Sequence, residues 1–260
     1  MHQYISLGAA CNAATMMKIA GLRKASFPFD WLLNLNAGLS VVTSIIQDDF
    51  QKVVAEDCYQ VVHHPPVGRA VPAYKDYPNT FHIHSDPSSN SAIHEEMIRR
   101  FERFRLVLRS SNTLHFVYYR NLSIYRDEKP DADVVEVLNL MLEEATQFLD
   151  TIEASRKGET FILLVLESDV EDTELTNEAL KHVRVADQRI SIGSALSRYD
   201  DNDELNAKWQ QDWIELIINH TKMPIWMKLR CKCKRLFRAF RKQIKGKKLN
   251  RTTVEIHHAA

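Results

Sequence analysis

Tyr4-Ile-Ser-Leu-Gly-Ala-Ala-Cys11-Asn-Ala-Ala-Thr-Met-Met-Lys-Ile-Ala-Gly-Leu22 is the stretch that decides the fold of this chain. It begins as a short apolar run, breaks at Gly8, and resumes after Cys11 with apolar residues at helical spacing. Glycine permits a tight turn that other residues resist. The stretch therefore predicts a strand, a glycine turn and a helix, with Cys11 in the first helical turn.

A cysteine at the start of a helix has a chemical consequence. The first backbone amides of a helix are unpaired and the helix dipole is positive there, so a thiolate is favoured. The amides near Gly8 and from Cys11 to Asn12 are candidates to hold the oxyanion of an acyl-transfer intermediate. On position alone, the competing interpretation is a buried Cys11 that packs as a small apolar side chain.

A second dense block follows, Gly21-Leu22-Arg23-Lys24-Ala25-Ser26-Phe27-Pro28-Phe29-Asp30-Trp31. Together with Ser6-Leu7-Gly8 and Cys11, it resembles the opening of a bacterial family of unknown function described as papain-like cysteine peptidases. The resemblance is close over residues 5–31, looser to about Trp213, and absent beyond. It implies a cysteine nucleophile that works with a histidine.

The same resemblance implies a histidine and an aspartate at about the distance from the cysteine that residues 82–86 occupy. His84-Ser85-Asp86 is the best local fit, and His82 is the alternative base. Phe81 to His84 is interpreted as a short strand, which would put both histidines on one face. The surrounding residues 53–90 are rich in proline and are expected to be mostly loop.

Two further sets of charged residues have open roles. Asp30 belongs either to a turn whose aromatic neighbours, including Trp31, fill the core, or to the catalytic site, where it would orient the histidine. A helix predicted from Asn90 to Arg109 carries Arg99 and Arg100 on its polar face. That face is either simply solvated or forms a clamp for a substrate phosphate or carboxylate.

Strand and helix patterns alternate along the rest of the chain. Thr160 to Leu166 is a near-continuous apolar run, typical of a parallel strand covered on both faces. Further strands are expected over 113–119 and over 183–185, the latter alone or together with Ile190 and Ile192. Helices are expected over 36–48, 133–152 and 203–218. The alternation predicts an α/β fold with helices on both faces of a mostly parallel sheet, either Rossmann-like or an esterase-like three-layer fold.

This order differs from that of papain-type enzymes, whose cysteine lies on a helix of a helical lobe between a serine and a tryptophan. Here Ala10 precedes Cys11 and Asn12 follows it. A nucleophile that follows the first strand of an α/β sheet is closer to esterases and acyltransferases. We therefore interpret the family's description as a statement about cysteine and histidine, not about fold.

Composition narrows the setting. The chain of 260 residues is 45% apolar, enough for a full core, and its four cysteines do not resemble a disulfide framework. No basic leader precedes the first apolar run, and no run approaches the roughly 18 apolar residues of a membrane-spanning helix. We expect a cytoplasmic protein, free or peripheral on the inner membrane, with no cofactor.

The charge is strongly asymmetric. Residues 1–220 hold 21 Lys and Arg against 33 Asp and Glu, a net charge of −12, whereas residues 221–260 carry a net charge of +12. We therefore expect an α/β catalytic-type domain over 1–220 and a basic amphipathic tail over 221–260. Aromatic and aliphatic residues at helical spacing within 222–251 favour an anionic membrane surface as the partner. Docking on the chain's own acidic body is the main alternative, and nucleic acid fits less well.

Taken together, the sequence favours a cysteine hydrolase or acyltransferase that acts on an acyl or amide group of a small molecule, peptide or glycan, in surface-glycan biosynthesis at the membrane. Cys11 would attack and His84 or His82 would move the proton, oriented by Asp30 or Asp86. Two alternatives stay open. One is a membrane-associated binding module without chemistry. The other is a zinc protein whose ligands would come from Cys58, His63, His64, His82 and His84.

Overall fold

The computed structural model describes residues 1–34, 37–64, 67–199, 201–221, 223–229 and 231. The chain forms two compact units, Met1–Lys222 and Met223–Ala260. Most of the basic tail predicted over 221–260 lies outside the described residues; within its described part, residues 225–229 and 231 are helical. None of the described helices has the length and apolar composition needed to cross a membrane.

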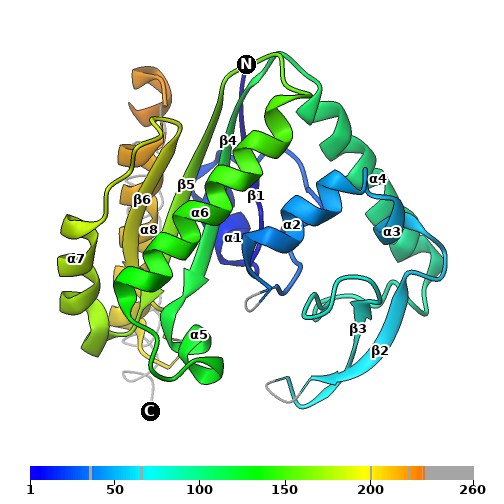
Figure 1. The fold of residues 1–260 in the computed structure, drawn as a ribbon, viewed down its shortest axis with the longest axis horizontal. Coiled ribbons are helices and arrows are strands. Elements are labelled where there is room, and N and C mark those ends of the chain that lie inside the picture. Colours follow the sequence, from blue (N-terminus) through cyan, green and yellow to red (C-terminus); the bar gives the residue numbers. More distant parts are fainter. Residues whose placement is uncertain (35–36, 65–66, 200, 222, 230, 232–260) are drawn as a thin grey trace, which may run out of the picture. The chain divides into compact units, whose positions relative to one another are not determined.

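The first unit is built on a four-stranded sheet in which every pairing is parallel. The strands lie in the order β1 (His2–Ser6), β4 (Thr113–Asn121), β5 (Thr160–Ser168) and β6 (Ile190–Leu196), with β1 at one edge (Figure 1). A separate antiparallel hairpin consists of β2 (Tyr59–His64) and β3 (Arg69–Tyr74).

Helices cover both faces of the parallel sheet. On one face α1 (Asn12–Ala20) contacts α8 (Asp203–His220), and on the other α6 (Val134–Glu153) lies between α2 (Gly38–Gln47) and α7 (Thr173–His182) (Figure 1). The remaining helices are α3 (Gln51–Val54), α4 (Ser91–Leu108) and α5 (Leu122–Glu128). The predicted α/β fold with helices on both faces is confirmed.

The structure differs from three local expectations. The strand expected from residue 183 onward begins only at Ile190. Residues 183–185 are mostly exposed and form no strand, whereas Ile190 and Ile192 lie in β6. The loop-rich segment 53–90 also contains the β2–β3 hairpin, which was not predicted from the sequence. Phe81 forms only isolated bridges, to Leu33 and Ala73, and the chain bends after His82.

Aromatic side chains connect the early loop to the sheet. Phe29 packs edge-on against Phe101 and Phe104 of α4, with ring centroids 5.9 and 5.4 Å apart. Phe104 in turn meets Phe116 of β4 at 6.3 Å. Burying these rings anchors residues 27–29 and α4 to the same core, which supports the loop that follows β1.

A buried ion pair fixes the start of α2. Arg120, at the end of β4, donates to Glu144 of α6 at 2.9 Å, and the side chains are only 2% and 9% exposed. Glu144 also accepts from the Leu39 amide at 3.3 Å. Gly38, with φ +72°, leaves no room for a side chain, because an added Cβ would lie 2.2 Å from Glu144. The carboxylate thus occupies the N-terminus of α2 as a structural anion.

The opposite end of the sheet buries a histidine. His115 of β4 is fully buried, stacks on Tyr4 with ring centroids 4.5 Å apart, and has its Nε2 2.9 Å from Nδ1 of His2. Burial and the neighbouring His2 lower its pKa to about 3. The His115 imidazole is therefore protonated near pH 6.5 in the unfolded chain, but only at a much lower pH in the folded chain.

We predict that stability falls as the pH drops from about 6.5 towards 4, because the unfolded state binds more protons over that range. His115→Phe keeps the stacking and should reduce the pH dependence of the unfolding free energy by up to about 1.4 kcal/mol per pH unit there. Urea unfolding at pH 7, 6, 5 and 4.5 measures this. His63→Gln, at an exposed position, is the matched control; an unchanged slope in His115→Phe would contradict the account.

Candidate active site

Cys11 lies at the carboxyl edge of the parallel sheet, where ligands bind in open α/β folds. Beyond β1, the Leu7 amide still donates to Val117 O at 3.0 Å, and the chain then turns at Gly8 with φ +93°. Cys11 is the residue directly before α1, and its carbonyl accepts from the Thr15 amide at 2.9 Å. Its side chain is partly exposed. The predicted strand, glycine turn and helix are therefore present.

Asn34 supports the turn at Gly8. Its amide donates to Ala9 O at 2.9 Å, and its side chain donates to Gly38 O at 3.1 Å. A Cβ on Gly8 would lie 2.2 Å from Asn34 Oδ1, so no other residue fits there without displacing the Asn34 side chain. Gly8 thus serves both the turn and this close approach.

Beside Cys11, the Asn12 side chain bridges the Cys11 sulfur and a buried carboxylate. Its Nδ2 donates to both oxygens of Glu167 at 3.0 and 3.1 Å, and its Oδ1 lies 3.9 Å from Cys11 Sγ. The Asn12 backbone amide donates to the hydroxyl of Tyr119. Asn12 is therefore fixed by both its backbone and its side chain.

Glu167 ends β5 and is only 1% exposed. Its Oε1 accepts from Trp209 Nε1 at 2.8 Å and from Trp213 Nε1 at 2.7 Å, and Asn121 also donates to the carboxylate. Burial raises the pKa of Glu167, while the indole and amide donors act in the opposite direction. In each of these contacts the donor is an N–H group. Through them the carboxylate connects β5 and α8 to the start of α1 beside Cys11.

Sequence reasoning missed Glu167, although a signal was present. A glutamate directly follows the apolar run of the clearest strand, at the edge where parallel sheets place functional groups. Trp209 and Trp213 lie on the helix that was predicted over 203–218, without any assigned partner. Their indole N–H groups need acceptors when buried, and Glu167 supplies one.

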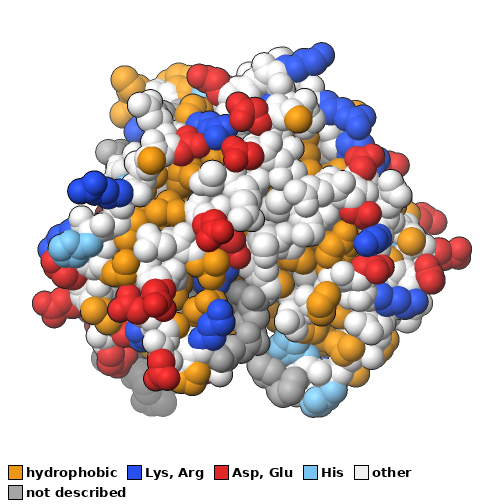
Figure 2. All heavy atoms as spheres, viewed as in Figure 1, with side chains coloured by type: hydrophobic (Ala, Val, Ile, Leu, Met, Phe, Trp, Pro, Cys, Tyr) orange, Lys and Arg blue, Asp and Glu red, His pale blue; other side chains and the backbone are white. Residues whose placement is uncertain are grey.

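The expected histidine segment is tied to the Gly8 turn through backbone pairing. Leu33 exchanges two hydrogen bonds with Phe81, at 2.9 and 2.8 Å, and the adjacent Asn34 bonds to Ala9. This brings the start of residues 81–84 beside the loop that supports the cysteine. On the face shown in Figure 2, histidine side chains gather at the lower right, over the β2–β3 hairpin.

The two candidate histidines have different surroundings. His82 is 4% exposed and packs edge-on between Tyr59 and Tyr74, with centroids 5.5 and 4.9 Å away. Burial and the nearby Arg100 lower its pKa to about 4. His84 is exposed, and its ring meets Trp31 edge-on at 5.6 Å. Trp31 is itself partly exposed, so the core is filled by Phe27 and Phe29 instead.

The two aspartates have local partners rather than a histidine. Asp30 is 1% exposed and accepts from Arg23 Nε at 2.9 Å and from the Phe27 amide at 3.0 Å. It therefore closes the loop that begins at Arg23. Asp86 accepts from the amides of Ser88 and Ser89 at 3.0 and 3.1 Å and caps its own turn.

The arginines of α4 each have a separate partner. Arg99 pairs with Glu95 at 3.6 Å on the surface, and Arg100 pairs with Glu96 one turn earlier. Arg103 donates to Ser26 O at 2.5 Å. These contacts support a charged helix face that packs on the early loop more than a clamp for an anion.

The proposed zinc ligands do not come together. Cys58 donates to Val53 O at 3.5 Å, and burial raises the pKa of its thiol to about 11. His64 packs on Phe81, and His82 packs between the two tyrosines. Within the part of the chain that the structure describes, no group of three His, Cys, Asp or Glu side chains is placed to hold a metal ion.

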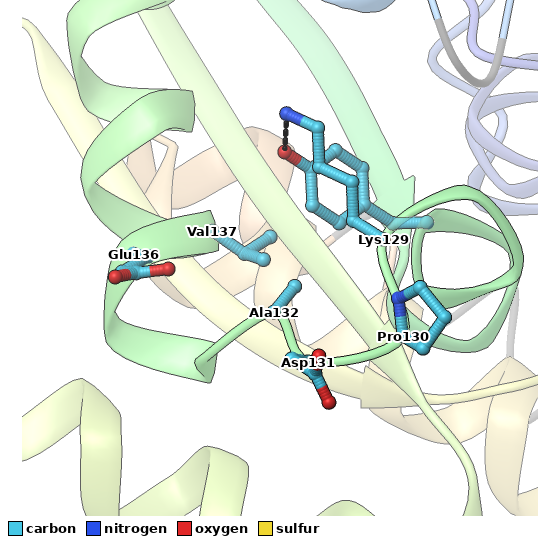
Figure 3. A pocket seen from close by; sticks show the side chains of 7 residues that line it. Lys129, Pro130, Asp131, Ala132, Glu136 and Val137 are labelled. Carbon is cyan, nitrogen blue, oxygen red and sulfur yellow. Dashed lines mark hydrogen bonds between the residues drawn. The ribbon is translucent and has the colours of Figure 1, made fainter.

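A pocket of about 350 Å³ lies elsewhere, between α5 and the start of α6 (Figure 3). Its lining consists of Tyr125, Lys129, Pro130, Asp131, Ala132, Glu136 and Val137. Lys129 Nζ donates to Tyr125 Oη at 3.1 Å across it. None of the residues predicted for catalysis lines this pocket.

Comparison with known proteins gives a family and one distant relative. The family model described as "Putative papain-like cysteine peptidase (DUF1796)" matches residues 2–166. Uncharacterized protein R408 of Acanthamoeba polyphaga mimivirus is 24% identical over 248 residues, which is 83% of this chain and 97% of that protein. No solved structure matches the chain. Because the family model covers more than half of the chain, including Cys11 and the 81–86 segment, the chain belongs to this family of papain-like cysteine peptidases.

Proposed function

We propose that the chain is a cysteine-nucleophile enzyme that cleaves or transfers an acyl or amide group, with Cys11 as the attacking residue. The observation that supports this best is the place of Cys11, partly exposed at a helix start on the carboxyl edge of a parallel sheet. Membership in a cysteine peptidase family agrees with it.

The reaction runs in two stages. The histidine takes the Cys11 thiol proton as the sulfur attacks the carbonyl carbon, and the carbonyl oxygen becomes an oxyanion that the amides at the start of α1 stabilise. The tetrahedral intermediate collapses to a thioester and expels the leaving group, which takes a proton from the histidine. Water or an alcohol then attacks the thioester with the histidine as base, and this regenerates the thiol.

His84 is the preferred base. It is exposed beside Trp31, whereas His82 is buried with a pKa of about 4 and is a weak proton acceptor at neutral pH. Asp30 and Asp86 are left out of this mechanism because each is bonded within its own turn. Gly8 shapes the turn, and Asn12 holds the corner beside the sulfur.

The acceptor decides between hydrolysis and transfer. A sugar hydroxyl as acceptor would make the chain an acyltransferase in surface-glycan biosynthesis, and its place would then be the inner membrane surface. The net charge of +12 over residues 221–260 supports attraction to anionic lipids. Ile225, Trp226 and Leu229 are 78, 59 and 58% exposed and add apolar side chains for the interface.

Cys11 should react with iodoacetamide at pH 7 about tenfold faster than a cysteine in an unstructured peptide, the effect of a thiol pKa lowered by about one unit. Peptide mass spectrometry of the full chain measures this. Cys58, buried with a pKa of about 11, is the internal control and should stay unlabelled. A rate no higher than that of the peptide would favour the non-catalytic binding module.

Replacing the base should slow acylation of Cys11 by an activated ester. We expect His84→Ala to reduce the rate about 10²- to 10⁴-fold, the usual contribution of a general base. His82→Phe keeps a ring between Tyr59 and Tyr74 and should reduce the same acylation rate by less than about tenfold. Stopped-flow kinetics decides; the reverse order would move the role to His82.

Deleting residues 222–260 should abolish cosedimentation with vesicles that contain phosphatidylglycerol, since roughly 1 kcal/mol of attraction is lost per basic residue near the surface. Binding of the full chain should weaken with added salt and with neutral phosphatidylcholine vesicles. Trp226→Ala retains the charge and tests the apolar contribution separately. Equal partition of the deleted and full chains would remove the membrane from the proposal.

A further inference from the structure

The Asn12 side chain contacts both the Cys11 sulfur and the Glu167 carboxylate. We propose that Glu167 is a positioning residue for Cys11: through the Asn12 amide, the two acids share one negative charge, and protonation of Glu167 favours the Cys11 thiolate. This inference rests on the proposed function, because it assigns to Cys11 a need to ionise.

The observed hydrogen bonds match one of the two protonation states. An ionised carboxylate only accepts, and it faces Nδ2 of Asn12, the Asn121 side-chain amide and the two indole N–H groups. The Asn12 amide then presents its oxygen to Cys11, and a carbonyl oxygen accepts from a thiol, not from a thiolate. In this state Glu167 carries the charge and Cys11 is protonated.

Rotation of the Asn12 amide by half a turn matches the other state. A protonated Glu167 donates through Oε2 to the Asn12 oxygen, while Oε1 continues to accept from Trp209 and Trp213. The Asn12 Nδ2 then points to Cys11 and donates to its thiolate. The proton lost by Sγ equals the proton gained by Oε2, so the total charge of the site is the same in both states.

The surroundings of the pair favour one shared charge over two. Tyr119 lies against both acids with its hydroxyl on the Asn12 amide, and burial raises its pKa, so it stays neutral. On the side of α8, Trp209 and Trp213 are neutral donors. The Arg198 guanidinium carbon lies over the Trp209 ring, 5.7 Å from the ring centroid. Two negative charges in this buried corner would repel each other strongly.

Glu167→Gln is the direct test, because it imitates the protonated carboxyl. Its amide oxygen can replace Oε1 toward the two indoles, and its amide nitrogen can replace Oε2 and donate to the Asn12 oxygen. The measurement is the pH midpoint of Cys11 alkylation, followed by peptide mass spectrometry in the wild type, Glu167→Gln, Asn12→Ala and the double variant. Cys58 reports on folding, since it labels only if the structure opens.

We expect Glu167→Gln to lower the midpoint by about one pH unit, which raises alkylation at pH 6 up to about tenfold. In the Asn12→Ala background the same substitution should shift the midpoint by less than half as much, since the connecting amide is gone. An unchanged or raised midpoint overturns the proposal. So does a shift of the same size with and without Asn12, which would indicate a direct charge effect alone.

If Cys58 becomes labelled in Glu167→Gln, infrared spectroscopy of chains that keep Glu167 supplies the second test. Cys11→Ala removes the competing acid, so the band of the protonated carboxyl should disappear at a lower pH than in the wild type. An identical carboxyl titration in both chains overturns the proposal. These readouts need no turnover. A chain that shows the coupled titration but forms no acyl-enzyme would refute the proposed function and leave the coupling intact.

Discussion

The buried carboxylate of Glu167 is the interaction on which the candidate site depends. It lies at the end of β5, receives the indole N–H groups of α8, and holds the side chain of the first residue of α1. Three elements far apart in the sequence are therefore fixed relative to one another by a single acceptor. Without those donors, an acid that is 1% exposed would be severely destabilising.

The block from Gly21 to Trp31 has a structural role that complements this network. Arg23 and Asp30 close the loop, Phe27 and Phe29 bury its middle in the core, and Trp31 is left partly exposed against His84. The next residues pair with Phe81 and with Ala9. The block thus brings the segment that contains the histidines to the turn that carries the cysteine, although the two are more than 60 residues apart.

Much of the fold could be predicted because periodicity reports burial. The apolar run from Thr160 and the spacing around Cys11 identified β5 and the β1–turn–α1 unit, while the prolines of 53–90 hid a hairpin whose Pro72 lies within β3. The site was predicted only in part. Cys11 and Gly8 follow from local pattern, but the partners of Asp30 and Glu167 depend on tertiary contacts that no spacing encodes. For Asp30 the sequence left a turn role and a catalytic role open, and the structure pairs it with Arg23.

The central claim is that Cys11 is a nucleophile, and capture of its acyl intermediate tests it most directly. The full chain is mixed with p-nitrophenyl acetate at pH 7, quenched in acid and analysed by intact and peptide mass spectrometry. The account predicts one acetyl group per chain, on Cys11, that is lost with time and absent in Cys11→Ala. Acetylation confined to lysines, at the same level in both chains, would contradict it.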